Sequence, residues 1–340
     1  MSYKPLKVAI AVNKDMAKSI FYEEDIAFLS SFAEINPLAD LPDEMSLEFM
    51  AQILQNADAC ITCWGTPAFS EDLLENAQKL RLISHAAGSV RHLVPQNYWD
   101  FGRRRITSNA PIIAEDVAQT TLALILCSLK GIWGFAKSTR SGEWSGGEAS
   151  LFATRRLENL QVGLIGGSHV GKEVVKILKP FGCSLKMYDP YVSLIEAAEL
   201  GVTMMELNDL ISTSDVISLH VPGIEECRHI INAENAPLMK DGALFINTAR
   251  GINVDEDALI KELKTGRIFA CIDVTNPEPP TKDHPFRVLE NVVLTPHIAG
   301  GHTINGRKSL GKNAIKKVYN YLIKGLLEHE IRPEMMDYIA

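Results

Sequence analysis

Residues 161–171 of this 340-residue chain read Gln-Val-Gly-Leu-Ile-Gly-Gly-Ser-His-Val-Gly. The first five are typical of a buried strand, the glycines predict a tight turn, and a helical pattern begins near Lys172. Such a turn lets the backbone approach a ligand closely, and amides at the helix N-terminus stabilise a phosphate. The stretch therefore predicts a parallel α/β sheet that binds a dinucleotide at this turn. The residues expected to contact it are Gly166, Gly167, Ser168, His169, Val170 and Gly171.

Asp189 follows the next predicted strand, Ser184–Tyr188. A carboxylate at this place can accept both ribose hydroxyls and would repel a 2′-phosphate, which favours NAD over NADP. Ser168 stands where the pattern G-x-G-x-x-G has its middle glycine. Its β-carbon would crowd the phosphate, although its hydroxyl could donate a hydrogen bond, or Gly167 could take over the role.

Short apolar runs alternate with helical patterns along the whole chain, which is typical of doubly wound sheets. Besides the two strands above, we expect strands at Lys7–Val12, Ala59–Cys63, Arg81–His85, Val202–Met204, Asp215–Val221, Ala243–Asn247, Ala270–Val274 and Asn291–Leu294. Helices are expected at Ile26–Ala33, Leu47–Gln55, Glu71–Ala77, Ala110–Gly131 and Gly306–Lys324. The apolar helix Ala110–Gly131 should be buried, between domains or subunits.

Length and composition narrow the class of protein. A chain of this size predicts two domains, and we place one at residues 1–108 plus 303–340 and the other at residues 109–302. The net charge of −8 and the scattered basic residues argue against nucleic acid as a partner. No apolar segment reaches the length of a bilayer, so we expect no membrane contact. The six cysteines and the lack of a signal pattern favour the cytoplasm.

Cys60 and Cys63 form a C-x-x-C pair, which could indicate redox chemistry or half of a zinc site. They lie in the apolar run Ala59–Trp64, and no second pair with metal-ligand spacing follows. We therefore interpret them as core cysteines and expect no metal.

Polar residues follow three predicted strands, at the edge where parallel sheets bind ligands. Arg250 follows the first, and its planar fork suits a substrate carboxylate. Glu278 follows the second and His297 the third. A histidine can give or take the proton that accompanies hydride transfer, and a carboxylate would orient and stabilise its imidazolium. Each residue alone could be structural, but the three together indicate one catalytic site.

These residues lie in the motifs N-T-A-R-G-x-x-V-D-E-x-A-L, D-V-x-x-x-E-P and L-T-P-H-I-A-G, which occur in this order. The chain thereby resembles the D-isomer-specific 2-hydroxyacid dehydrogenases, which include phosphoglycerate, glycerate, hydroxypyruvate and D-lactate enzymes. The resemblance implies that Arg250 binds the carboxylate and carbonyl, that His297 is the acid/base and that Glu278 is its partner. It also implies cofactor contacts at His220, Val221, Pro222, Thr248, Ala249 and Asp273.

The resemblance implies a substrate-carboxylate loop as well, at Ala87, Gly88, Ser89 and Val90, whose backbone amides would bind the carboxylate. Members of the family commonly have an aspartate next, but this chain has Arg91 and His92. These two residues either face solvent or suit a second acidic group on the substrate. Ile224 and Cys227 stand where the family usually has threonines. We interpret His169, His220 and His302 as lining or core residues.

The resemblance further implies a Rossmann-type cofactor domain inserted into a smaller flavodoxin-like substrate domain, with hinges near Asn109 and His302. Domain closure would bring the Ser89 amides toward Arg250. NADH would deliver a hydride to C2 of a 2-oxo acid while His297 supplies the proton, and we expect a homodimer. The alternative from another class is an NAD(H)-sensing, corepressor-like protein with little turnover. Formate dehydrogenase is a lesser alternative, because those relatives carry glutamine in place of Glu278.

Overall fold

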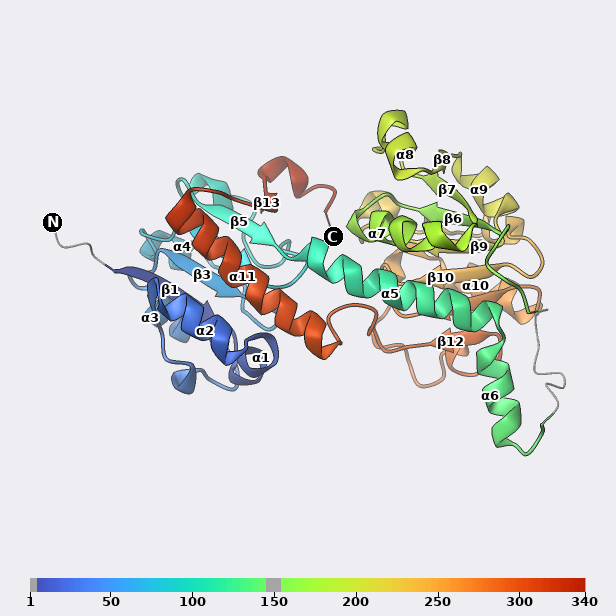
Figure 1. Ribbon diagram of the computed structural model, residues 1–340, viewed down its shortest axis with the longest axis horizontal. Coiled ribbons are helices and arrows are strands. Elements are labelled where there is room, and N and C mark those ends of the chain that lie inside the picture. Colours follow the sequence, from blue (N-terminus) through green and yellow to red (C-terminus); the bar gives the residue numbers. More distant parts are fainter. Residues whose placement is uncertain (1–4, 145–153, 340) are drawn as a thin grey trace. The chain divides into compact units, whose positions relative to one another are not determined.

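The computed structural model describes residues 5–144 and 154–339 (Figure 1). The chain divides into two compact units. Unit 1 consists of Met1–Ile113 and Gly301–Ala340, and unit 2 consists of Ala114–Gly300. Two separate segments of chain thus build unit 1, and unit 2 is inserted between them.

Unit 1 contains a six-stranded sheet in the order β13-β5-β4-β3-β1-β2. Its strands are β1 (Leu6–Ala11), β2 (Ala33–Ile35), β3 (Ala59–Thr62), β4 (Leu82–His85), β5 (Arg105–Ser108) and β13 (Glu330–Ile331). Neighbouring strands are parallel except for the pair of β13 and β5. The order 2-1-3-4-5 of the parallel strands is that of flavodoxin-like sheets, as the sequence predicts.

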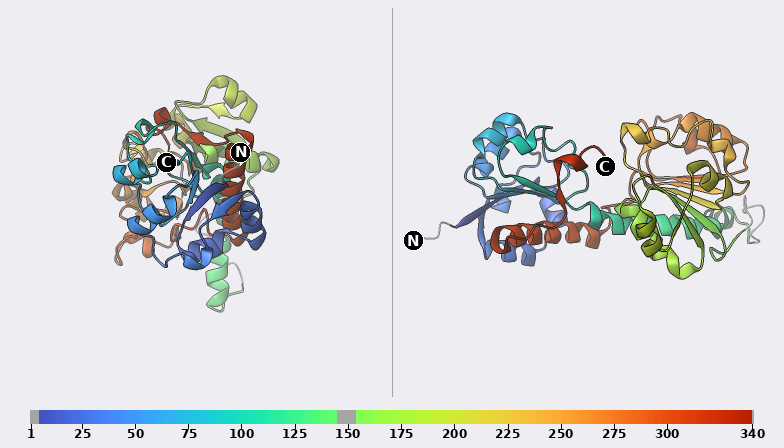
Figure 2. Two further views of the ribbon diagram at one scale, coloured as in Figure 1. Left: turned by 90° about the vertical axis from the view of Figure 1, so that its left-hand side faces the viewer. Right: turned by 90° about the horizontal axis from the view of Figure 1, so that it is seen from above.

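Helices cover both faces of this sheet (Figures 1 and 2). They are α1 (Lys14–Ile20), α2 (Glu23–Ser30), α3 (Leu47–Leu54), α4 (Glu71–Asn76) and α11 (Ile304–Lys324). Strand β1 shows why two layers form, because its side chains alternate between the faces. Val8 and Ile10 pack in one core with residues of α1, α2 and α11, whereas Ala9 and Ala11 pack in the other with α3 and α4.

Unit 2 contains a fully parallel sheet of seven strands in the order β12-β11-β10-β9-β6-β7-β8. Its strands are β6 (Gln161–Ile165), β7 (Ser184–Tyr188), β8 (Thr203–Met204), β9 (Val216–Leu219), β10 (Leu244–Asn247), β11 (Phe269–Ile272) and β12 (Val292–Leu294). The strand order changes direction at β6, and ligands of such sheets bind at this switch point.

Two hydrophobic cores flank the sheet of unit 2. One is packed by α9 (Leu207–Thr213) and α10 (Glu256–Lys264), and the other by α5 (Ala110–Leu129), α7 (His169–Leu178) and α8 (Leu194–Leu200). A further helix, α6 (Ile132–Arg140), follows α5. Both units therefore have the doubly wound architecture that the sequence predicts.

Several local predictions were wrong. Helix α2 begins at Glu23 rather than Ile26, because the Asp25 carboxylate caps it by accepting the Tyr22 amide at 3.1 Å. Helix α7 begins at His169 rather than Lys172, because Ser168 is its N-cap. No bounds were predicted for three strands and five helices, namely β2, β5, β13, α1, α6, α8, α9 and α10.

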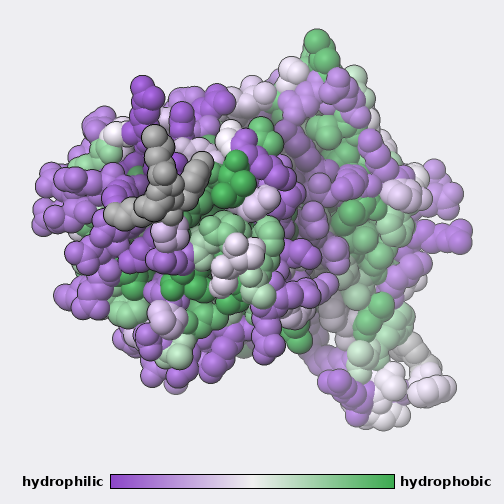
Figure 3. Space-filling model, turned by 60° about the vertical axis from the view of Figure 1, so that its left-hand side comes forward, coloured by the Kyte–Doolittle hydropathy of each residue, from purple (hydrophilic) through white to green (hydrophobic). Residues whose placement is uncertain are grey.

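The expectation that no apolar segment reaches bilayer length was also wrong. Helix α5 has 20 residues and a mean hydropathy of 1.6, so length and composition alone would let it cross a membrane. The same properties suit a core helix. Ile113 packs against the core of unit 1, and Leu124, Ile125 and Leu129 pack within a core of unit 2. These contacts account for part of its apolar character, because 39% of its most apolar 18-residue stretch is buried. On the face in Figure 3, hydrophilic and apolar side chains are interspersed, as on most folded proteins.

Candidate functional site

The glycine-rich turn joins β6 to α7 at the switch point of the unit 2 sheet. A β-carbon on Gly171 would lie 2.1 Å from the Gly166 carbonyl oxygen, so this position requires glycine. Ser168 precedes the helix, and its hydroxyl accepts the Gly171 amide at 3.4 Å and donates to the His220 carbonyl at 2.8 Å. The serine that departs from the glycine pattern thus caps the helix and ties the turn to the end of β9.

Asp189, at the end of β7, holds the same turn. One carboxylate oxygen accepts the Gly167 amide at 2.6 Å, and the other accepts the Tyr191 amide at 2.7 Å. Its position at the carboxyl end of β7 is the one from which such a residue reaches a ribose.

The loop after β10 carries Arg250. Asn247 braces it, because its side chain accepts the Ala249 amide at 3.0 Å and donates to the Arg250 carbonyl at 3.1 Å. A β-carbon on Gly251 would lie 2.1 Å from the backbone of Thr275, so glycine here lets this loop touch the loop after β11. Thr248 is buried beside Thr121, with 3.1 Å between their hydroxyl oxygens.

Arg250 is partly buried, and burial lowers the pKa of its guanidinium, an effect that the Glu278 carboxylate opposes. Within residues 5–144 and 154–339, its guanidinium makes one hydrogen bond, to the Ala249 carbonyl at 2.7 Å. A guanidinium has five N–H donors, so most of the donors of Arg250 are available to a ligand.

Glu278 and His297 follow β11 and β12, and they form a direct pair. The His297 Nδ1 lies 2.6 Å from the Glu278 Oε1, and both side chains are nearly half exposed. The backbone of His297 has a φ of +54°, a conformation that is uncommon for residues other than glycine. Its amide donates to the Asp273 carbonyl at 2.8 Å, which helps to hold this conformation.

Asp273 is 2% exposed and anchors the loop that carries His297. Its carboxylate accepts the Thr295 hydroxyl at 2.6 Å and the amides of Ile298 and Ala299, both at 2.9 Å. These hydrogen bonds give Asp273 a structural role that the sequence did not indicate. The expected contact of Asp273 with the nicotinamide carboxamide stays a prediction.

His220, Val221 and Pro222 follow β9 beside the glycine-rich turn. His220 is 3% exposed, and burial lowers its pKa to about 3, so the ring is neutral. Neither ring nitrogen has a hydrogen-bond partner in the part of the chain that the structure describes. Asn253 donates to the Pro222 carbonyl at 2.8 Å and thereby fixes this loop.

Comparisons with known proteins indicate the family of the chain. Residues 122–299 match the model of the D-isomer specific 2-hydroxyacid dehydrogenase, NAD binding domain. The D-3-phosphoglycerate dehydrogenase of Methanocaldococcus jannaschii is 34% identical over 313 residues, which are 91% of this chain but only 57% of that protein. The glyoxylate reductase of Thermococcus litoralis is 31% identical over 320 residues, 93% of this chain and 94% of that protein. The chain belongs to the D-isomer-specific 2-hydroxyacid dehydrogenase family.

A solved structure is similar to this chain over both of its units. The 2-hydroxyacid dehydrogenase from Ketogulonicigenium vulgare Y25 superposes with a TM-score of 0.75 at 25% identity, covering 97% of this chain and 98% of that one. The matched family region lies entirely within unit 2, which is therefore the NAD-binding domain.

The loop that the family resemblance assigns to the substrate carboxylate lies in unit 1, after β4. Ala87 and Val90 are buried, whereas Gly88 and Ser89 are partly exposed. Arg91 is exposed and donates to the Ile339 carbonyl at 3.4 Å, and His92 is exposed as well. Both side chains are thus exposed in unit 1, and a role toward a second acidic group on the substrate stays a prediction.

The other departures from the family pattern also have structural accounts. Ile224 is 7% exposed and packs as an apolar residue, and partial burial raises the pKa of the Cys227 thiol. Cys60 and Cys63 are buried free thiols whose pKa burial raises, which fits core cysteines.

Sequence reasoning missed Glu256. One carboxylate oxygen accepts the Asn276 amide at 2.8 Å, and the other lies 3.0 Å from the His284 Nε2. Glu256 thus braces the loop that presents Glu278. The position of Glu256 within the N-T-A-R-G-x-x-V-D-E motif could have indicated a role. The motif does not show that the Glu256 carboxylate contacts the Asn276 amide.

Proposed function

We propose that this chain is an NAD-dependent dehydrogenase that moves a hydride between nicotinamide and a small D-2-hydroxy acid or 2-oxo acid. The observation that carries the proposal is the pair of His297 and Glu278, 2.6 Å apart, at the same sheet edge as Arg250 with its unused donors. An acid/base pair beside a guanidinium suits the reduction of a carbonyl next to a carboxylate.

The turn at β6 suits NAD. The N-terminus of α7 favours a pyrophosphate, and Asp189 at the end of β7 suits ribose hydroxyls and disfavours a 2′-phosphate. The unpartnered ring nitrogens of His220, buried beside this turn, would be satisfied by polar groups of such a ligand. When bound, NADH supplies the hydride.

Residues of the chain bind the substrate and transfer the proton. Arg250 binds the substrate carboxylate and stabilises the negative charge that develops on the carbonyl oxygen. His297 donates the proton to that oxygen in the reductive direction and takes it back in the oxidative one. Glu278 orients the imidazole and stabilises its protonated form. The amides of the Ala87–Val90 loop of unit 1 suit the substrate carboxylate.

The test is a panel of 2-oxo acids with NADH, followed by the loss of NADH absorbance. Glyoxylate, hydroxypyruvate and its 3-phosphate are the first members, because relatives are named for these reactions. We expect turnover of at least one small 2-oxo acid with NADH, and at least tenfold less with NADPH as the control. Tight NADH binding without turnover of any acid would instead identify an NAD(H) sensor.

We also propose a cytoplasmic homodimer. Six free cysteines favour a reducing compartment. The exposed apolar residues Ile132 and Trp133 of α6 favour contact with a second copy. Sedimentation at several concentrations would reveal a monomer if this is wrong.

A further inference from the structure

Lys317 of α11 is an ammonium group buried in unit 1, with 1% of its surface exposed. Its Nζ donates to the Ser108 carbonyl at 2.7 Å and to the Asn109 Oδ1 at 2.6 Å. Neither acceptor is charged, and burial lowers the pKa of Lys317 to about 8. An apolar side chain of similar size would avoid the desolvation cost, so core filling does not explain a lysine here.

The two residues that Lys317 holds are themselves bound to the substrate loop. The Asn109 amide donates to the Ala87 carbonyl at 2.9 Å. The Ser108 hydroxyl donates to the next carbonyl, that of Gly88. The Asn109 side chain also donates to the Leu310 carbonyl of α11 at 2.8 Å, which secures the assembly to the same helix.

These bonds set the direction in which the loop amides point. In a trans peptide the carbonyl and the following N–H point in opposite directions. Because the carbonyls of Ala87 and Gly88 face Ser108 and Asn109, the amides of Gly88 and Ser89 face away from them. Neither amide has an acceptor among residues 5–144 and 154–339. Two adjacent free amides form a site that suits a carboxylate.

His85 lies two residues before Ala87, the first residue of the loop. It ends β4, is 1% exposed, and its Nδ1 lies 2.9 Å from the Thr62 hydroxyl. Burial lowers its pKa to about 3. The neutral ring is therefore held to β3, and the bonds to the loop carbonyls come from Ser108 and Asn109.

We propose that Lys317 is a positioning residue for the substrate carboxylate. It acts through Ser108 and Asn109 to hold the Gly88 and Ser89 amides in the orientation in which they bind a 2-oxo acid. This inference rests on the proposed function, and it adds a residue to which the family motifs assign no role.

The first experiment replaces Lys317 with methionine in the full chain, with Lys316→Met as the matched control, because Lys316 is the exposed neighbour on the same helix. With the best acid of the panel, Lys317→Met should raise KM about tenfold and leave kcat within about threefold. The Kd for NADH should not change, because the cofactor binds unit 2. Lys316→Met should behave as the wild-type chain.

The second experiment uses Ser108→Ala, which removes the donor to Gly88 and keeps the ammonium. It should raise KM for the acid in the same way and leave NADH binding intact. The double variant should be little worse than either single variant, because both changes break one chain of contacts. This variant decides the question if Lys317→Met does not fold.

The possible outcomes separate the two proposals. A wild-type chain that reduces none of the acids would overturn the proposed function and this inference with it. Turnover by the wild-type chain, with an unchanged KM in folded Lys317→Met or in Ser108→Ala, would overturn the inference alone. A joint loss of kcat and NADH affinity would also overturn it, because it would show a general structural role.

Discussion

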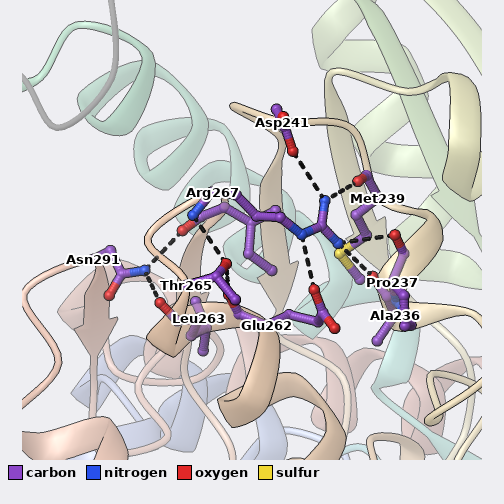
Figure 4. A network of polar contacts seen from close by, with 10 residues as sticks. Ala236, Pro237, Met239, Asp241, Glu262, Leu263, Thr265, Arg267 and Asn291 are labelled. Carbon is purple, nitrogen blue, oxygen red and sulfur yellow. Dashed lines mark hydrogen bonds and ion pairs between the residues drawn. The ribbon is translucent and has the colours of Figure 1, made fainter.

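Strands β10, β11 and β12 have an arginine near each end of the group, and the two arginines differ in how many of their hydrogen-bond donors are used. At the amino ends, Arg267 is the centre of a saturated network (Figure 4). Its guanidinium donates to the Met239, Ala236 and Pro237 carbonyls and pairs with Glu262 at 2.8 Å and Asp241 at 3.4 Å. Asn291 adds bonds to the Leu263 and Ile268 carbonyls, both at 2.8 Å.

At the carboxyl ends, Arg250 has one hydrogen bond to its neighbour Ala249 within the described residues. Burial nevertheless lowers the pKa of its guanidinium. A partly buried guanidinium whose N–H donors have no acceptor lowers the stability of the fold. Proteins typically carry such a cost at functional sites. The comparison teaches that hydrogen-bond satisfaction, rather than residue type, separates the scaffold arginine from the proposed catalytic one.

The largest effect that this comparison predicts is on Arg250→Ala. Turnover of the 2-oxo acid should fall on the order of 10³-fold, because charge on the substrate oxygen loses its donor. Steady-state kinetics measures this, and fluorescence titration should show unchanged NADH affinity. Arg250→Lys should recover little, since lysine lacks the planar fork. Normal turnover of the true substrate by either variant would contradict the assignment.

Arg267→Ala should show the reverse pattern. It leaves the carbonyls of the buried residues Ala236 and Met239, and the Glu262 carboxylate, without their donor. We therefore expect a loss of about 3 kcal/mol in the free energy of unfolding. Denaturant unfolding measures this loss. At a temperature where the variant is folded, kcat and KM should stay within about twofold of the wild-type values. A selective loss of kcat would show that the amino ends also serve catalysis.

Glu278→Gln should lower kcat about tenfold, because the His297 imidazole loses the carboxylate that orients it from 2.6 Å. Steady-state kinetics with the best acid of the panel measures this. Glu290→Gln, which removes an exposed carboxylate paired with Lys137, is the control. A kcat of Glu278→Gln equal to that of the wild-type chain would discredit the pair.

The smallest predicted effect concerns Ser168, which is a satisfied residue at the carboxyl edge. Ser168→Ala should cost about 1 kcal/mol of stability through the lost cap of α7, and Ser168→Gly only a few tenths. Thermal unfolding with and without NADH compares them. If alanine were tolerated better than glycine, the capping role would be refuted.

Helices and strands were predicted correctly where residues within or next to the element determine it. Gln161–Ile165 and Ser184–Tyr188 form strands with the predicted bounds, because apolar runs and turn residues define both of them locally. The strand Glu330–Ile331 was missed because it has two residues and exists only by pairing with β5. Helix α7 was placed three residues late, since the capping role of Ser168 was not recognised.

In the candidate site, too, short motifs predicted the positions of residues along the chain, whereas their contacts depend on the fold. The three motifs predicted that Arg250, Glu278 and His297 follow adjacent strands, and the structure brings the last two into contact. The buried position of Lys317 had a signal, since it shares a helical stripe with Leu310 and Ala314. No role was predicted for Lys317, because lysine side chains are seldom fully buried.

The sequence by itself determined two doubly wound sheets, the glycine-rich turn at the switch point, and the edge where the polar residues gather. Those features follow from periodicity and from short motifs, which act over a few residues. Only the tertiary structure decided that Arg267 is saturated, that Arg250 keeps its donors, and that Lys317 is buried against Ser108. The physical reason is that hydrogen-bond partners come from distant segments, so the satisfaction of a charged group exists only in the folded chain.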